Sequence, residues 1–163
     1  MKFLSCNIRF FGADDGANSW PYRKEACIQI IQAQKPDIIC FQEMWQEQFL
    51  ELQAAFPNFA SYGLPHEPLG QHPLNAIFYR QENFVQVAAG GYWLSKTPHV
   101  AGSKSWDSRG IRFANWLRLR DVSTDVEFRL INTHLDHVGW EARRKQAALI
   151  VEDTAAYPLG YPQ

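Results

Sequence analysis

Two histidines and an aspartate lie within four positions of each other in the segment INTHLDHVGW, residues 131–140. An apolar run leads into this segment, so we expect an extended backbone whose side chains alternate between two faces. Asn132, His134 and Asp136 then share one face. A histidine that donates to a phosphate oxygen, oriented by a neighbouring carboxylate, fits this spacing. The segment therefore predicts a phosphate-binding or catalytic site centred on His134.

A zinc site is the alternative that the two histidines suggest. It would pair His134 with His137, but residues three positions apart in a strand point to opposite sides. Asp136 is the only extra ligand nearby, and no Cys-x-x-Cys or His-Glu-x-x-His motif completes a set. Zinc held by His134 and His137 is the weaker interpretation.

Glu43 directly follows the apolar run DIICFQ (37–42), where a charge is expected only at the exposed end of a buried strand. Ligands often bind beyond strand ends in layered α/β folds. A single carboxylate suits Mg²⁺, which keeps waters and substrate oxygens among its ligands. The alternative is that Glu43 merely begins the next helix and favours its dipole.

Asn7 lies near the end of the first expected strand, Lys2–Arg9, on the face opposite Leu4 and Cys6. Its amide could hold a metal-bound water or a phosphate oxygen. The alternative is an ordinary turn residue at the end of a strand.

Charge is distributed unevenly along the chain. Residues 95–120 carry six basic side chains against one acidic, and residues 37–67 carry five acidic and no basic. If both segments face one cleft, they form a metal side and an anion-binding side. If they do not, they are two solvated surfaces of different sign.

Hydrophobic periodicity and proline positions predict the elements that must position these residues. We expect helices from near Pro21 to before Pro36, over 45–56 and over 140–156, and strands over 2–9, 37–42, 59–64, 74–80 and 84–95, the last bulged at Gly90-Gly91. A long loop, 96–112, precedes two alternating strands joined by a hairpin at Ser123-Thr124-Asp125. This order predicts an α+β or layered α/β domain with helices outside the sheets.

The bulk composition narrows the class of protein. The chain has 163 residues, of which 46% are hydrophobic, and a net charge of −1. It is therefore globular and does not coat nucleic acid by charge alone. Cys6, Cys27 and Cys40 are interpreted as buried thiols of a reducing compartment. Because no signal peptide or bilayer-spanning run is visible, we expect no transmembrane segment and a cytoplasmic location.

Six stretches in order resemble the endonuclease/exonuclease/phosphatase superfamily of deoxyribonuclease-like metal-dependent hydrolases. They are SCNIRF (5–10), PDIICFQEM (36–44), NAIFYR (75–80), GYWLSKTP (91–98), SKSWDSRGIRFANWLRL (103–119) and INTHLDHVGWEARRKQA (131–147). The resemblance implies an α+β fold, a two-layer β-sandwich flanked by helices in four layers, α/β/β/α. It also implies a Mg²⁺ or Mn²⁺ cofactor and hydrolysis of a phosphodiester or phosphomonoester by activated water.

The resemblance assigns roles residue by residue. Glu43 matches the metal-ligating glutamate, Asn7 the asparagine that supports metal and phosphate, and His134 the histidine that binds the scissile phosphate. Asp136 and Asn132 share the side of His134, and we expect them to serve catalysis and substrate binding. Trp106, Asp107 and Arg109 lie in the stretch that borders the substrate.

The sequence departs from the family pattern at its C-terminal end. Family members continue into a strand ending in Gly-Asp-x-Asn and finish with Asp-His, whereas this chain stops at YPLGYPQ. We therefore expect residues 1–163 to be a single partial domain, C-terminally incomplete and catalytically impaired. Exposed sheet edges would then favour a homo-oligomer or pairing with a missing half. A non-catalytic fragment or binding module is the alternative function.

The substrate class stays open among a phosphorylated small molecule, a lipid headgroup and nucleic acid. A net charge near zero and the lack of long basic helices favour the first two over duplex DNA.

Overall fold

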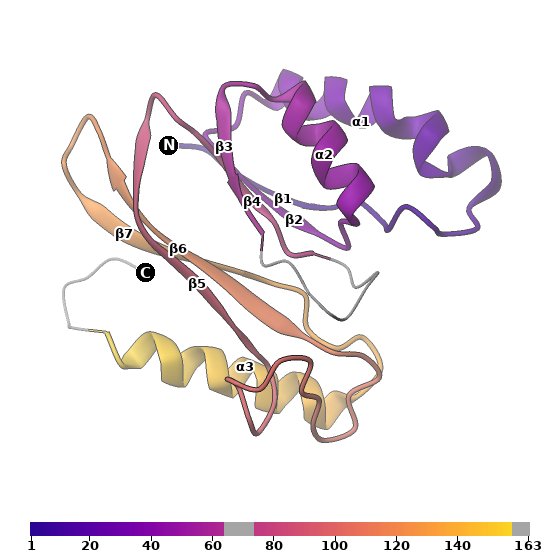
Figure 1. The fold of residues 1–163 in the computed structure, drawn as a ribbon, viewed down its shortest axis with the longest axis vertical. Helices are drawn as coiled ribbons and strands as arrows, with labels where there is room; N and C mark the ends of the chain where they lie inside the picture. Colours follow the sequence, from indigo (N-terminus) through magenta and orange to yellow (C-terminus); the bar gives the residue numbers. More distant parts are fainter. Residues whose placement is uncertain (64–73, 158–163) are drawn as a thin grey trace. The chain divides into compact units, whose positions relative to one another are not determined.

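The computed structural model describes residues 1–63 and 74–157. The chain divides into two compact units, Met1–Phe84 and Val85–Gln163, and Figure 1 shows the elements of each. The Pro/Gly/His loop, the end of the expected strand 59–64 and the tail after residue 157 lie outside the described residues.

The first unit contains a four-stranded sheet in the order β1-β2-β4-β3. Its strands are β1 Phe3–Asn7, β2 Ile38–Gln42, β3 Phe59–Tyr62 and β4 Ile77–Arg80. β1 and β2 run parallel, with Asn7 beside Gln42 at their carboxyl ends, while β4 is antiparallel to both β2 and β3. The parallel pair brings the residues that follow β1 and β2 to the same edge of the sheet.

Two helices, α1 (Trp20–Gln34) and α2 (Gln46–Ala55), lie on one face of this sheet (Figure 1). Pro21 stands in the first turn of α1, where its missing N–H costs nothing, and Lys35 ends the helix in a left-handed conformation at φ 48°. Trp20 and Leu52 bring the helices against Phe41 and Phe78 of the sheet in one hydrophobic core. Both helices thus follow the predicted boundaries within one residue.

The second unit contains a three-stranded sheet in the order β5-β6-β7, with helix α3 along it (Figure 1). The elements are β5 Phe84–Trp93, β6 Phe113–Asp121, β7 Glu127–Thr133 and α3 Trp140–Ala155. β6 and β7 form the predicted hairpin, in register from Ala114↔Thr133 to Arg120↔Glu127. Leu149 and Ile150 of α3 pack against Tyr92 and Ala114 of the sheet.

These elements confirm the predicted α+β class with two sheets and flanking helices. Gly90 lies within β5, where the bulge stays a prediction, and a Cβ at this position would meet the Trp116 ring at 2.6 Å. The glycine allows a close approach of the neighbouring strand's side chain.

The three cysteines are free thiols of intermediate exposure. The prediction that they are buried was therefore wrong, because Cys6 and Cys27 lie at the margin of the first unit's core.

None of the helices in the described part of the chain is both long enough and apolar enough to cross a membrane.

Candidate functional site

Asn7 and Glu43 meet at the carboxyl ends of β1 and β2. The Asn7 amide nitrogen donates to Glu43 Oε1 over 3.0 Å. Glu43 adopts φ 58°, a left-handed backbone conformation that is unusual for a residue other than glycine. Such conformations persist where surrounding structure holds them, and they cluster at functional sites. Glu43 is therefore turned out of the strand, at the point where β2 ends.

The backbone after Asn7 is held by side chains of both helices. Arg23 of α1 donates to the carbonyls of Ile8 and Arg9, and Gln48 of α2 donates to the Arg9 carbonyl over 2.9 Å. The Arg9 N–H in turn donates to Asn7 Oδ1 over 3.0 Å. The Asn7 side chain is thus fixed from both ends, through its oxygen by the loop and through its nitrogen by Glu43.

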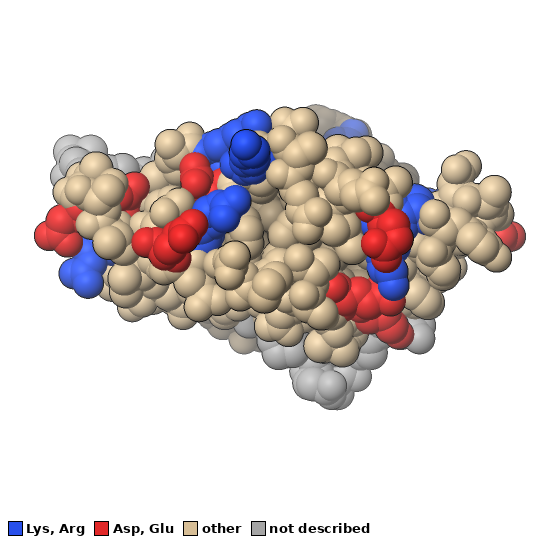
Figure 2. All heavy atoms as spheres, turned by 90° about the horizontal axis from the view of Figure 1, so that it is seen from above, with Lys and Arg blue, Asp and Glu red and all other residues tan. Residues whose placement is uncertain are grey.

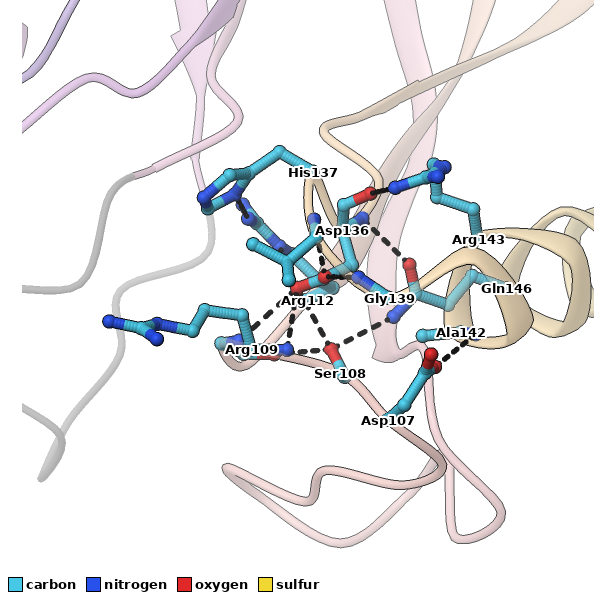
Figure 3. Close-up of polar contacts among 12 residues, drawn as sticks. Asp107, Ser108, Arg109, Arg112, Asp136, His137, Gly139, Ala142, Arg143 and Gln146 are labelled. Atoms are coloured by element: carbon cyan, nitrogen blue, oxygen red, sulfur yellow. Dashed lines mark hydrogen bonds and ion pairs between the residues drawn. The ribbon is translucent and has the colours of Figure 1, made fainter.

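Asp136 is the polar centre of the second unit (Figure 3). It is fully buried. Its Oδ2 accepts from the Arg109 N–H at 3.0 Å and the Ser108 hydroxyl at 3.1 Å, and it also receives the Gly110 N–H and Arg112 Nε. Its Oδ1 accepts from the N–H groups of Val138 and Gly139, at 3.0 and 2.7 Å. One carboxylate therefore ties the long loop to the turn that follows β7.

This environment sets the charge of Asp136. Burial acts to raise its pKa, but the N–H groups of Gly139, Gly110, Val138 and Arg109 outweigh burial and hold the pKa well below its usual range. The group is thus ionised at neutral pH, with its lone pairs occupied.

Two further contacts fix the same region. Gln146 of α3 accepts from the Asp136 N–H at 2.9 Å and donates to Ser108 Oγ at 3.3 Å. Asp107 Oδ1 accepts from the Ala142 N–H in the first turn of α3 at 2.7 Å, where a carboxylate is favourable. Asp107, predicted to border the substrate, thus has a helix-capping contact as well.

The other predicted residues of the second unit lie around this cluster. The exposed Arg109 side chain points away from Asp136 (Figure 3), although its backbone N–H binds that carboxylate. The backbone of Trp106 adopts a left-handed conformation, with φ 59°. Asn132 is buried and pairs in register with Asn115, and His134 is partly exposed just after the end of β7.

The structure brings together Asn7 with Glu43, and Asp136 with Ser108 and the Arg109 N–H. Sequence reasoning placed Asp136 only beside His134, and it missed Ser108, Gly139 and Gln146 as partners of the cluster. Gly139 directly precedes the expected helix, where glycine is a favourable cap, and that was the only local signal among the three. Asn7 and Glu43 belong to the first unit, and the other predicted site residues belong to the second. That the two groups act in the same reaction stays a prediction.

The family model described as Endonuclease/Exonuclease/phosphatase family matches residues 4–160. The chain belongs to the endonuclease/exonuclease/phosphatase family. The resemblance to this family that the sequence indicated is thereby confirmed.

Two solved structures from Bacteroides resemble the chain in fold and sequence. An endonuclease/exonuclease/phosphatase from Bacteroides vulgatus is 32% identical with a TM-score of 0.85, over 93% of this chain and 57% of that one. A mannosyl-6-phosphatase from Bacteroides thetaiotaomicron is 31% identical with a TM-score of 0.90, over 98% of this chain and 61% of that one.

A curated relative, the 3'-5'-exoribonuclease subunit Ccr4 of the CCR4-Not complex from Emericella nidulans, is 25% identical. The match covers 88% of this chain and 24% of the relative. The chain thus spans less than two thirds of the length of each of these three similar proteins.

The donor atoms near Glu43 allow a test of the metal that the family implies. Within residues 1–63 and 74–157 no group of three or more His, Cys, Asp or Glu side chains is placed to hold a metal ion. Zinc takes three or four such ligands, so the described donors do not suit it. His137 also has its Nδ1 taken by Arg112 Nη2 at 2.8 Å. One carboxylate beside one amide suits Mg²⁺, which binds through one or two carboxylates and retains waters.

Proposed function

We propose that this chain carries the metal- and phosphate-binding residues of a Mg²⁺-dependent phosphoesterase that hydrolyses a phosphomonoester or phosphodiester by activated water. The observation that carries the proposal is the hydrogen bond from Asn7 to Glu43 at the ends of two parallel strands. Family membership supports the reaction class.

Glu43 is the proposed metal ligand, and Asn7 is its partner. The Asn7 amide restrains the carboxylate, and the Arg23 and Gln48 contacts restrain the loop that holds Asn7. Such restraint keeps ligands in one geometry and lowers the entropy lost on binding. Bound Mg²⁺ would supply charge that polarises the phosphate toward attack by water.

His134 is the proposed donor to the scissile phosphate, and Arg109 a proposed contact to its charge. Asp136 acts on both as a positioning residue, because it fixes the turn after His134 and accepts the Arg109 backbone N–H. Since no solvent reaches Asp136, a direct contact between its carboxylate and substrate is not proposed. Asn132 and Trp106 remain predicted substrate neighbours.

A small phosphorylated molecule is the proposed substrate class. The relative named a mannosyl-6-phosphatase is 31% identical over nearly the whole chain. Lys and Arg side chains are interspersed with Asp and Glu on the face shown in Figure 2. Mixed charge of this kind does not form a continuous basic surface that would bind a nucleic-acid backbone there. A hexose 6-phosphate is therefore the first substrate to test, with a diaryl phosphodiester as the comparison.

The test measures metal binding and turnover separately. Mn²⁺ binding is followed by electron paramagnetic resonance, and phosphate release is followed with Mg²⁺ on both substrates. The variant is Glu43→Gln. The matched control is Glu25→Gln, which makes the same change on the exposed surface of α1.

We expect Glu43→Gln to lose Mn²⁺ binding and Glu25→Gln to keep it. Any Mg²⁺-dependent turnover should fall by about 10²-fold or more in Glu43→Gln, the order expected for loss of a group at the reacting centre. Equal Mn²⁺ binding by both variants would overturn the assignment of Glu43. Metal binding without turnover on any phosphoester would favour a non-catalytic binding module.

A further inference from the structure

His137 is an exposed side chain of the candidate site to which the proposed function assigns no role. It follows Asp136 in the turn after β7, and its ring Nδ1 lies 2.8 Å from Nη2 of Arg112. A guanidinium carries only donors, and an imidazole nitrogen accepts a hydrogen bond only when it bears no hydrogen. Arg112 is therefore the donor in this contact, and the ring hydrogen of His137 lies on Nε2.

Asp136 holds His137 in place by two routes. Arg112, whose side chain is 14% exposed, pairs through its Nε with Asp136 Oδ2 at 3.4 Å. The other oxygen of the same carboxylate accepts the N–H of Val138, the residue directly after His137, at 3.0 Å. Because Asp136 is fully buried, both the backbone and the ring of His137 are tied to an anchor inside the unit. The exposed imidazole thus loses much of the rotational freedom of an ordinary surface side chain.

His137 and Arg109 present hydrogen-bond donors on the solvent side of the Asp136 cluster. Both side chains are exposed, and in the view of Figure 3 both extend to the side opposite Gln146 of α3. The Asp136 backbone carbonyl is occupied, since it accepts from Arg143 Nη1 at 3.1 Å. A ligand that approaches His137 from solvent therefore meets N–H groups of an imidazole and a guanidinium. Phosphate oxygens carry charge and only accept, so these donors bind them more strongly than neutral acceptors.

We propose that His137 is a further phosphate-binding residue, whose Nε2–H donates to a nonbridging oxygen of a phosphomonoester. Arg112 is the positioning residue, because it fixes the tautomer that presents this hydrogen. The inference rests on the proposed function, since it adds a donor to the phosphate that His134 and Arg109 are proposed to bind. A phosphomonoester presents three acceptor oxygens, and a diester has one of them esterified. An additional donor therefore favours the monoester as the substrate class.

The first measurement tests the tautomer without any substrate. The full chain, isotope-labelled in its five histidine rings, is observed by long-range proton–nitrogen NMR at about pH 8, where imidazole is neutral. We expect the ring signals that disappear in His137→Gln to show the hydrogen on Nε2 in the wild type. Arg112→Met removes the donor at Nδ1 and should leave His137 as a mixture of tautomers. A wild-type His137 with its hydrogen on Nδ1 overturns the proposal, and that reading needs no Arg112 variant.

The second measurement tests phosphate binding in the absence of metal. Inorganic phosphate is titrated into the labelled protein, with sodium chloride at equal ionic strength as the reference. We expect a saturable shift of the His137 Nε2 signal with phosphate and none with chloride. In titration calorimetry His137→Leu should bind phosphate about 10-fold more weakly, the order expected for loss of one hydrogen bond to a charged group. His137→Gln should lose less than about 3-fold, because its amide N–H can donate from near the position of Nε2.

His99→Leu is the matched control, because it makes the same change at an exposed histidine of the same unit. It should bind phosphate like the wild type. Equal losses in His99→Leu and His137→Leu, or no phosphate-dependent shift at His137, overturn the proposal.

Metal binding separates failure of this inference from failure of the proposed function. If His137 fails these tests while Mn²⁺ binding and turnover still depend on Glu43, the proposed function stands and only the role of His137 is rejected. If phosphate binding depends on His137 but Mn²⁺ binding does not depend on Glu43, the metal site is rejected and the phosphate contact stands.

Discussion

Asp136 joins the loop after β5 to the turn after β7, and its replacement tests how much that junction stabilises the fold. Asp136→Asn removes the charge and presents an amide NH₂ to a set of partners that, apart from the Ser108 hydroxyl, can only donate. We expect a loss of about 3 kcal/mol in the free energy of unfolding, because buried donors lose a charged acceptor. Asp14→Asn, an exposed aspartate, is the matched control and should change stability by less than about 0.5 kcal/mol in urea titration.

The same residue gives a pH dependence with a defined sign. The folded-state pKa of Asp136 is lowered by backbone N–H groups, whereas an unfolded aspartate titrates near pH ~3.9. Its contribution to stability is therefore present above that value and lost as pH falls toward the folded pKa. The stability difference between wild type and Asp136→Asn should shrink between pH ~5 and ~2 in parallel urea titrations. A constant difference would contradict the ionised, hydrogen-bonded carboxylate.

Residue types and spacing predicted the positions of side chains more closely than their contacts. Glu43 and Asn7 were predicted at strand ends, and the parallel pairing of β1 and β2 is what brings those ends together. Asp136 was predicted to orient a histidine, because alternation along a strand shows only which side chains share a face. Its contacts with Ser108 and Gly139 arise from two loop conformations, which periodicity does not encode.

At the scale of elements, Gly139 fixes how the N-terminus of α3 meets the long loop. A Cβ at this position would lie 2.5 Å from both the backbone oxygen and Oδ1 of Asp107. We expect Gly139→Ala to lower the free energy of unfolding by about 1–3 kcal/mol, because the backbone or the helix cap must shift. Gly110→Ala, where an added Cβ meets nothing within 4 Å, is the control. Equal melting temperatures for the two variants would contradict the close approach.

The C-terminal half of α3 is anchored by an ion pair. Arg129 of β7 is 2% exposed, lies over the Trp116 and Tyr157 rings, and pairs with Asp153 of α3 at 2.7 Å. Asp153→Asn should cost about 3–5 kcal/mol in urea titration, because it leaves the buried guanidinium without its counter-charge.

An exposed pair elsewhere in the same unit provides the comparison. Asp125 pairs with Arg120 at 3.6 Å, and the Asp125 side chain is 86% exposed. Asp125→Asn makes the same chemical change and should cost less than about 0.5 kcal/mol, because water screens exposed pairs. If both variants lost the same stability, burial of Arg129 would not be the cause.

Element boundaries were predictable where proline or a change of periodicity marks them. Pro21 and Pro36 bracket α1, and the alternating pattern on either side of residues 123–125 gives the β6–β7 hairpin. Gly90 was less predictable, because a glycine in a strand fits either a bulge or a close neighbour. The position of the Trp116 ring shows the close neighbour, which periodicity along β5 does not encode.

At the scale of the whole molecule, the edge strands are where copies of the chain would meet. β5 stands at one end of the described three-stranded sheet, and Val85 and Val87 on it are 44% and 37% exposed. An edge strand with exposed apolar side chains favours pairing with another strand. We therefore expect self-association of two copies through β5, at tens of micromolar protein.

Light scattering after size exclusion measures this association against the chain mass of 18.8 kDa. Val87→Lys should return the protein to that mass, because a charged side chain at a sheet edge disfavours strand addition. Val122→Lys introduces the same charge at a valine that is 58% exposed in the β6–β7 turn, and it should leave the association unchanged. A wild-type mass equal to one chain at every concentration would rule out edge pairing, and an equal effect of both lysines would assign the association to net charge instead of β5.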